Sequence, residues 1–297
     1  MGKVSILDVA DMKSRGEKIA MITAYDYTTA QVADQSGIPL VLVGDSLGKV
    51  VLGYDSTIPV TMEDMLHHAK AVARGVKQCL IVVDLPFMSY QVDEAQALAN
   101  AGRLMPEGGA HSVKLEGGEK IAPTVARIIE AGIPVMGHIH LSVHGLGGYR
   151  VQGRQREQTE QLIKDAHALE DAGAYSVVLE VVPTELAGLI TRQLKIPTIG
   201  IGAGPDCDGQ VQVCHDLLGT FTDVLPKHVK RYATLADTTQ VAFTQYIEDV
   251  RQGLFFTKVR SISMDESVIA SLETPQLAHT RLRVRPRGRI GAVSDRI

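Results

Sequence analysis

The sequence predicts an α/β fold, namely a closed (β/α)8 barrel, or TIM barrel, on two observations. Short apolar runs rich in valine and isoleucine recur along the chain, and stretches with helical spacing of apolar residues lie between most of them. Runs this apolar are typical of strands covered on both faces, as in a parallel sheet. The 297 residues suffice for a barrel of about 250 residues with an extension.

Seven apolar runs are strand candidates, and they cover residues 19–26, 40–46, 80–87, 112–118, 133–138, 176–183 and 196–204. Helical spacing between them is clearest over residues 62–76, 124–133 and 160–174. The GIP turns place glycine where a helix ends and proline where a helix cannot continue. We expect an eighth, weaker strand over TDVLPK (222–227) and a final helix over 235–253.

The alternating pattern stops after Phe256. We therefore expect a catalytic barrel over residues 1–256 and a C-terminal extension over residues 257–297. The extension carries an arginine-rich tail, RLRVRPRGR (281–289), with arginine at every second position. No aromatic residue alternates with these arginines to stack on bases, so a solvated tail is favoured over a strand that binds nucleic acid or an acidic partner.

Charge and composition exclude several classes of function. A net charge of −4 and a pI near 6.2 give no basic field for nucleic acid or anionic lipid. The three cysteines are an odd number without metal-ligand spacing, which favours a reducing cytoplasm over a disulfide framework. The first residues mix acids and bases, unlike a signal peptide, and no apolar run reaches the roughly 18 residues of a membrane span.

Ionisable side chains end five consecutive predicted strands. The carboxyl ends of the strands form the active-site face of a parallel barrel, so these side chains are expected to meet there. One acid after a strand is usually structural, but five strands in succession predict an active site. The residues are Asp45 with Ser46, Asp84, Lys114 with Glu116, His138 and Glu180.

Three carboxylates at one barrel mouth, Asp45, Asp84 and Glu116, would repel one another unless a cation neutralised them. A few oxygen ligands that leave room for water and substrate suit Mg²⁺ better than zinc. Lys114 lies two residues before Glu116 and so projects to the same face, where it can hold a substrate carboxylate or keto oxygen. The pattern fits a chelated α-keto acid whose neighbouring C–H is acidified by stabilisation of the enolate.

Long motifs over residues 4–255 then resemble a known family. They are TAYDY (23–27), VGDSLG (43–48), GYDSTIPVTMEDM (53–65), DLPFMSY (84–90), VKLEGG (113–118), GGYRVQGR (147–154), LEVVP (179–183), GIGAGPDCDGQV (200–211) and PKHVKRYA (226–233). These blocks are similar to those of 3-methyl-2-oxobutanoate hydroxymethyltransferases, also called ketopantoate hydroxymethyltransferases.

The resemblance implies a barrel of the phosphoenolpyruvate/pyruvate type. It implies transfer of a hydroxymethyl group from 5,10-methylenetetrahydrofolate to 3-methyl-2-oxobutanoate, which gives ketopantoate (2-dehydropantoate) for pantothenate biosynthesis. It further implies a homo-oligomer, commonly a decamer. The residues that match the family's sites are Asp45, Asp84 and Glu116 for Mg²⁺, Asp45, Ser46, Asp84, Lys114 and His138 for the keto acid, and Glu180 as general acid/base.

The chain departs from the family pattern in two places. The usual GH(L/I)GLTPQS is replaced by GHIHLSVHGLGGY (137–149), so His140 stands for a glycine and the loop is about two residues shorter. If the strand continues, His140 faces the site near the approach of the folate; if the chain turns at once, His140 is solvated. The arginine-rich tail replaces the family's acidic-His-Ser-Phe ending.

Two other functions stay open at this point. Lys114 would form a Schiff base in a metal-free aldolase, although the neighbouring acids favour a charged amine. Alternatively, a barrel with the altered loop would bind keto acid with impaired turnover. The GIGAG segment (200–204) lacks the spacing of a nucleotide loop and is interpreted as a barrel turn. We expect helix-packing or surface roles for His67 and His68, and no nucleophilic cysteine.

Overall fold

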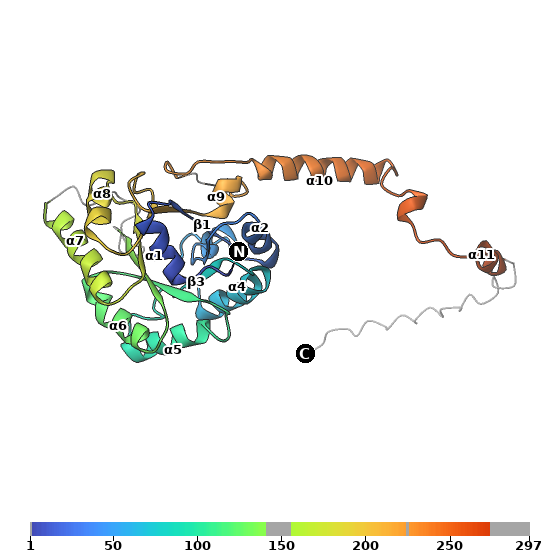
Figure 1. Cartoon of the computed structure of the whole chain (residues 1–297). Coiled ribbons are helices and arrows are strands. Elements are labelled where there is room, and N and C mark those ends of the chain that lie inside the picture. Colours follow the sequence, from blue (N-terminus) through green and yellow to red (C-terminus); the bar gives the residue numbers. More distant parts are fainter. Residues whose placement is uncertain (1, 141–155, 224–225, 274–297) are drawn as a thin grey trace, which may run out of the picture. The chain divides into compact units, whose positions relative to one another are not determined.

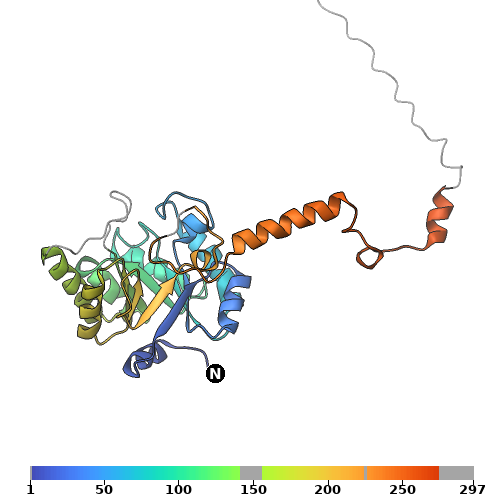
Figure 2. The same cartoon turned by 90° about the horizontal axis from the view of Figure 1, so that it is seen from above.

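A computed structural model describes residues 2–140, 156–223 and 226–273, and its centre is a closed barrel of eight parallel strands. Each strand pairs with the next, and β8 pairs with β1; Figure 2 shows these two, in orange and blue, side by side. The strands are β1 (Ile19–Thr23), β2 (Leu40–Val43), β3 (Leu80–Asp84), β4 (Ser112–Glu116), β5 (Val135–His140), β6 (Ser176–Glu180), β7 (Thr198–Ile201) and β8 (Gly209–Gln212). The predicted fold class is confirmed.

Helices follow most strands and lie outside the barrel, as α4 to α8 do in Figure 1. Several of them begin at polar caps that the sequence supplies: Thr61 and Asp64, for example, form a capping box at the start of α4. The helices are α1 (Ile6–Ser14), α2 (Tyr27–Gln35), α3 (Leu47–Val50), α4 (Met62–Gly75), α5 (Glu94–Leu104), α6 (Ala122–Glu130), α7 (Arg156–Asp171), α8 (Thr184–Gln193) and α9 (Cys214–Leu218), with a short 3₁₀ turn, η1 (Glu119–Ile121).

Two apolar layers hold the barrel together. The larger packs the outer faces of the strands against the helices, and the smaller fills the barrel interior with residues such as Met21, Leu80 and Met136. Val9 of α1 is fully buried in the interior layer, so α1 closes the end of the barrel where the strands begin. The opposite end, where the strands finish, carries the polar groups.

The prediction of the eighth strand over TDVLPK was wrong. The eighth strand is the GQVQ segment of β8, and the described residues of 222–227 form no strand. Two glutamines and a glycine interrupt the apolar pattern of β8, and a short loop rather than a helix joins it to β7, so the alternation that marked the other strands is missing. The first seven predicted strands and the three predicted helices between them are present.

The chain divides into two compact units, Met1–Asp237 and Thr238–Ile297. The barrel lies wholly in the first. The expected final helix is α10 (Leu235–Arg251), and η2 (Lys258–Arg260) and α11 (Glu266–Glu273) follow it. The domain limit at residue 256 stays a prediction, and the arginine-rich tail lies outside the described residues. In the described part of the chain, no helix has both the length and the apolar character of a membrane span.

Candidate active site

Strand register brings the predicted site residues together. Asp84 of β3 lies opposite Lys114 of β4, and Glu116 of β4 lies opposite His138 of β5. One step further round the barrel, His140 of β5 lies opposite Glu180 of β6. Since paired residues of neighbouring strands lie side by side, the register alone places these ionisable groups in one continuous row.

Asp45, Asp84 and Lys114 form the first cluster. The backbone N–H of Asp45 donates to Asp84 Oδ2 over 3.1 Å, and Lys114 Nζ lies 3.0 Å from Asp84 Oδ1. No hydrogen bond of good geometry from a described residue reaches that Oδ1, although it is buried. A side chain at Gly44 would come within 2.9 Å of Ser46 Oγ, so the glycine lets the backbone approach the carboxylates.

The charges in this cluster perturb one another. Burial, then the negative charges of Asp84 and Glu116, raises the pKa of Asp45 to about 7. Burial also raises the pKa of Asp84, against the opposing effect of Lys114. Burial lowers the pKa of Lys114, but the surrounding carboxylates outweigh it and the net pKa is raised. Lys114 is therefore held as an ammonium amid an excess of acid.

His138 connects this cluster to Glu180. Its Nδ1 lies 3.1 Å from both Lys114 Nζ and Glu116 Oε1, and its Nε2 lies 3.1 Å from Glu180 Oε2. A neutral imidazole accepts at Nδ1 from Lys114, whereas a charged one donates to Glu116. Burial and the charge of Lys114 lower the pKa of His138, but contacts with Glu116 and Glu180 outweigh them and raise it. His138 is thus placed to donate to Glu180 in either state.

Glu180 lies between two imidazoles. Its Oε1 is 3.4 Å from Nε2 of His140, while Oε2 faces His138. Burial raises the pKa of Glu180, but the two histidines outweigh this and hold it well below its usual range. His140 is the last residue of β5 and lines the cavity, so the structure shows the extended alternative rather than the solvated one. Residues 141–155 of the altered loop lie outside the described residues.

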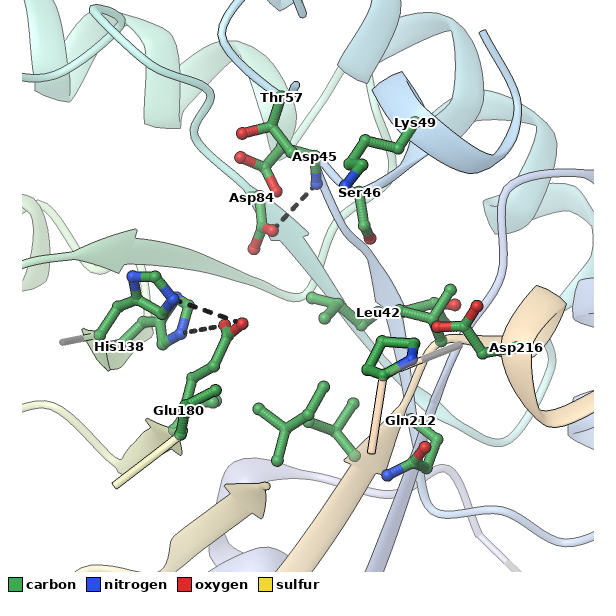
Figure 3. A pocket seen from close by; sticks show the side chains of 18 of the residues that line it. Leu42, Asp45, Ser46, Lys49, Thr57, Asp84, His138, Glu180, Gln212 and Asp216 are labelled. Atoms are coloured by element: carbon green, nitrogen blue, oxygen red, sulfur yellow. Dashed lines mark hydrogen bonds and ion pairs between the residues drawn. The ribbon is translucent and has the colours of Figure 1, made fainter. Parts of the chain in front are cut away.

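A cavity of about 510 Å³ opens above these groups. Figure 3 shows His138 and Glu180 on one side, Asp45, Ser46 and Asp84 above, and Asp216 and Gln212 on the far side. The sequence prediction missed the lining residues Lys49, Thr57, Gln212, Asp216, Phe221, Lys227 and His228. A signal existed for Asp216, which lies just after β8, but that strand was assigned to a different segment.

Two buried tyrosines hold residues of the site in place. Ser46 Oγ lies 2.8 Å from the hydroxyl of the buried Tyr25, and the hydroxyl of Tyr90 bonds both backbone groups of Glu116. Both tyrosines were missed as supporting residues. His68 Nδ1 contacts the carbonyl of Tyr25 over 2.6 Å, a packing role as expected.

The GIGAG segment ends β7 and turns through Gly202 and Gly204, both with positive φ. A side chain at Gly204 would collide with Thr184, which explains the glycine in this barrel turn. Burial raises the pKa of all three cysteine thiols, and all three are free and buried, which disfavours a nucleophile. Among the described residues, no three His, Cys, Asp or Glu side chains are arranged to hold a metal ion.

The fold and the charged strand ends define a (β/α)8-barrel enzyme. Solved structures with the same fold include phosphonopyruvate hydrolase in complex with oxalate and Mg²⁺ (TM-score 0.57, 14% identity, 91% of this chain and 95% of that one). Another is 2,3-dimethylmalate lyase, a member of the PEP mutase/isocitrate lyase superfamily (TM-score 0.56, 14% identity, 90% and 94%). At this identity the likeness shows the fold alone.

The chain belongs to the ketopantoate hydroxymethyltransferase family, whose model matches residues 3–258. It is 55% identical to the 3-methyl-2-oxobutanoate hydroxymethyltransferase of Chloroflexus aurantiacus over 271 residues, 91% of this chain and 96% of the relative. The enzyme of the same description from Dehalococcoides mccartyi is also 55% identical, over 91% of this chain and 98% of the relative. The resemblance read from the motifs is confirmed.

Proposed function

We propose that this protein transfers a hydroxymethyl group from 5,10-methylenetetrahydrofolate to 3-methyl-2-oxobutanoate, giving ketopantoate for pantothenate biosynthesis. Support comes from the family and from relatives described by this activity. Within the molecule, the observation that carries the proposal is the row of buried and half-buried ionisable groups that runs from Asp84 to Glu180 along the cavity. Such a row suits a substrate that must be held by its charge and deprotonated at carbon.

The acidic cluster fits a divalent cation. Asp84 Oδ1 is buried with the Lys114 ammonium 3.0 Å away, and burial, then the neighbouring carboxylates, raises the pKa of Asp45. One ammonium thus faces three carboxylates, so a further positive charge would relieve the cluster. Mg²⁺ is commonly held by one or two carboxylates plus water and substrate oxygens. We propose Asp45, Asp84 and Glu116, the three predicted ligands, as the residues that would hold it. Their described side chains are not arranged to hold a metal ion, and Glu116 contacts His138, so binding would require these side chains to turn toward the ion. When bound, the ion supplies polarisation of the keto group, which acidifies the C3–H.

The protein's own residues perform the remaining steps. Lys114, held as an ammonium, binds an oxygen of the keto acid together with Ser46. Glu180 is placed to accept the C3 proton as general base, and its hydrogen bond with His138 keeps it oriented. The two histidines keep it ionised but also lower its pKa and so its basicity. Water hydrolyses the methylene bridge of the folate, which breaks both carbon–nitrogen bonds and releases tetrahydrofolate and formaldehyde. The carbon nucleophile then adds to the carbonyl carbon of the formaldehyde, whose oxygen becomes the hydroxyl once it takes up a proton. Tetrahydrofolate is the second product.

The electrostatics of Lys114 argue against the Schiff-base aldolase. A nucleophilic lysine needs a depressed pKa, whereas three carboxylates raise that of Lys114. Borohydride would trap a keto acid on Lys114 in an aldolase even in the presence of a chelator. We expect no such adduct.

Tetrahydrofolate formation from the two substrates, with Mg²⁺ and with chelator, tests the proposal. The matched variant is Glu180→Gln, which should bind keto acid normally but lower kcat by about 10²–10⁴-fold, the usual contribution of a positioned base. No tetrahydrofolate from the wild-type protein would refute the proposed function. Keto acid binding without turnover would instead support the alternative of an impaired barrel.

We also propose a homo-oligomer, as the family resemblance implies. Large apolar side chains on α10 support it: Val241, Phe243 and Tyr246 are all more than half exposed. Such residues commonly mark association surfaces. Sedimentation velocity would give the number of subunits, and a decamer is the expected result.

A further inference from the structure

The keto acid leaves much of the cavity unexplained. A short-chain keto acid held between Asp84 and Glu180 is much smaller than the cavity of about 510 Å³. The far wall, which Figure 3 shows around Asp216 and Gln212, has no part in the deprotonation of the keto acid. The groups on that wall are the ones available to a second, larger ligand.

Asp216 is the unusual residue of that wall. It is 7% exposed and lines the cavity, and its carboxylate makes no hydrogen bond or ion pair with any other described residue. Burial raises its pKa, although His228, Arg231 and Lys49 lie near enough to lower it against that effect. Asp34, which is 6% exposed, shows the ordinary case: its Oδ1 accepts from the backbone N–H groups of Gln78 and Cys79. A buried carboxylate needs donors to offset its desolvation. For Asp216 such donors can come from a ligand in the cavity.

We propose that Asp216 binds the amino-pyrimidine edge of the pterin ring of the folate, an inference that rests on the proposed function. This edge presents two neighbouring donors, the 2-amino group and the N3–H, and a carboxylate accepts both at once. No other side chain of the far wall offers two acceptor oxygens of this kind among the described lining residues.

Neighbouring side chains suit the rest of a folate. Val213 and Phe221 line the cavity near Asp216 and provide apolar surface for the ring. Lys227 and His228 are exposed at the margin and, with Lys49, form a basic rim for the carboxylates of the glutamate tail. The ring would therefore lie inside the cavity with its reactive face toward Glu180, and the charged tail would reach solvent.

The test compares Asp216→Asn and Asp216→Ala with the wild type. We measure the Kd of tetrahydrofolate by calorimetry, the KM for methylenetetrahydrofolate, and the KM for the keto acid. Loss of charge-assisted hydrogen bonds should raise the Kd and KM of the folate about 10- to 100-fold. The keto acid KM should stay within about twofold. Asp206→Asn, an exposed acid on the loop before β8, is the matched control and should change neither ligand.

The inference is overturned if the Kd of tetrahydrofolate and the KM for methylenetetrahydrofolate of the Asp216→Asn variant stay within twofold of the wild-type values. It is also overturned if the KM for the keto acid rises as much as the KM for the folate. Thermal unfolding checks that each variant is folded, and the isosteric Asn variant decides if the Ala variant is not. If the wild-type protein binds no tetrahydrofolate, the proposed function itself fails. If it binds but Asp216→Asn has no effect, only the role of Asp216 is refuted.

Discussion

Two lysine–aspartate ion pairs lie at opposite ends of the barrel and have opposite consequences. Where the strands begin, Lys13 of α1 lies 2.8 Å from Asp208. The same ammonium donates to the carbonyls of Thr191 and Ile196, and Asp208 Oδ2 also accepts from the backbone N–H of Thr198. Each charge of this pair is satisfied within the chain.

Where the strands end, Lys114 and Asp84 form a pair at 3.0 Å that is not self-contained. Asp45, Glu116 and His138 add further charge within the same cluster, so that the Lys114 ammonium faces three carboxylates. A buried ion pair whose charges are both fully partnered thus serves to hold the fold together. When the partners are incomplete, the pair costs stability and provides a binding site.

The largest expected effect is a loss of activity on changing the ion pair where the strands end. Asp84→Ala should lower the rate of tetrahydrofolate formation by about 10³-fold or more, because it removes both a proposed metal ligand and the partner of Lys114. Mg²⁺ affinity, measured by calorimetry, should fall with it. A variant with more than a tenth of wild-type activity would remove Asp84 from the chemistry.

The matching change at the other end should act on stability. Lys13→Met should lower the free energy of unfolding by about 2–4 kcal/mol, because it leaves the largely buried Asp208 without its cation. Urea unfolding measures this, and kcat should stay within about twofold. Adding Asp208→Asn should recover part of the loss. A tenfold fall in kcat without loss of stability would show that the two ends are not separable in this way.

A smaller effect concerns pH. The pKa of Asp45 is about 7 in the folded protein against an ordinary value of 3.8, so its contribution to stability is present below the ordinary value and is lost as pH rises through about 7. Metal-free Asp45→Asn should therefore gain stability relative to wild type as pH rises from about 4 to about 7, with the full difference reached at pH 8. Urea unfolding of both proteins against pH, with chelator present, measures the difference. Parallel curves would contradict the charge crowding at the site.

The smallest effect is expected at His140. His138 still holds Glu180 in the His140→Gly variant, so kcat should change by no more than about threefold. Removal of the imidazole from the cavity wall should lower the KM for methylenetetrahydrofolate and leave the keto acid KM unchanged. Steady-state kinetics from about pH 5.5 to 8 measures both. Identical folate kinetics in the two proteins would mean that the exchange of glycine for histidine is neutral.

The sequence predicted the barrel end where the strands finish better than it predicted the pairing of β8 with β1 that closes the barrel. Asp45, Asp84, Lys114 and Glu180 all follow long apolar runs, and in a parallel barrel such positions must converge, so the rim could be derived without coordinates. Strand β8 has no such run and no helix before it, and its assignment required the pairing with β1.

Contacts between residues far apart in the chain could not be predicted from the sequence either. The bond between His138 and Glu180 depends on the register of β5 with β6, which no local pattern specifies. The position of Asp216 at the cavity depends on helix α9, which follows the missed strand. The contact of Tyr25 with Ser46 depends likewise on how two loops meet above the barrel. These features depend on tertiary packing rather than on hydrophobic periodicity.

Deuterium exchange at C3 of 3-methyl-2-oxobutanoate tests the central claim most directly, because it follows deprotonation of the keto acid without any folate. With Mg²⁺ in D₂O, the wild-type protein should exchange the C3 proton, as followed by NMR. Asp84→Ala and Glu180→Gln should reduce the exchange at least about 10²-fold, and Lys13→Met should leave it unchanged. Equal exchange in the wild-type protein and the Asp84→Ala variant would contradict the assignment of the chemistry to this end of the barrel.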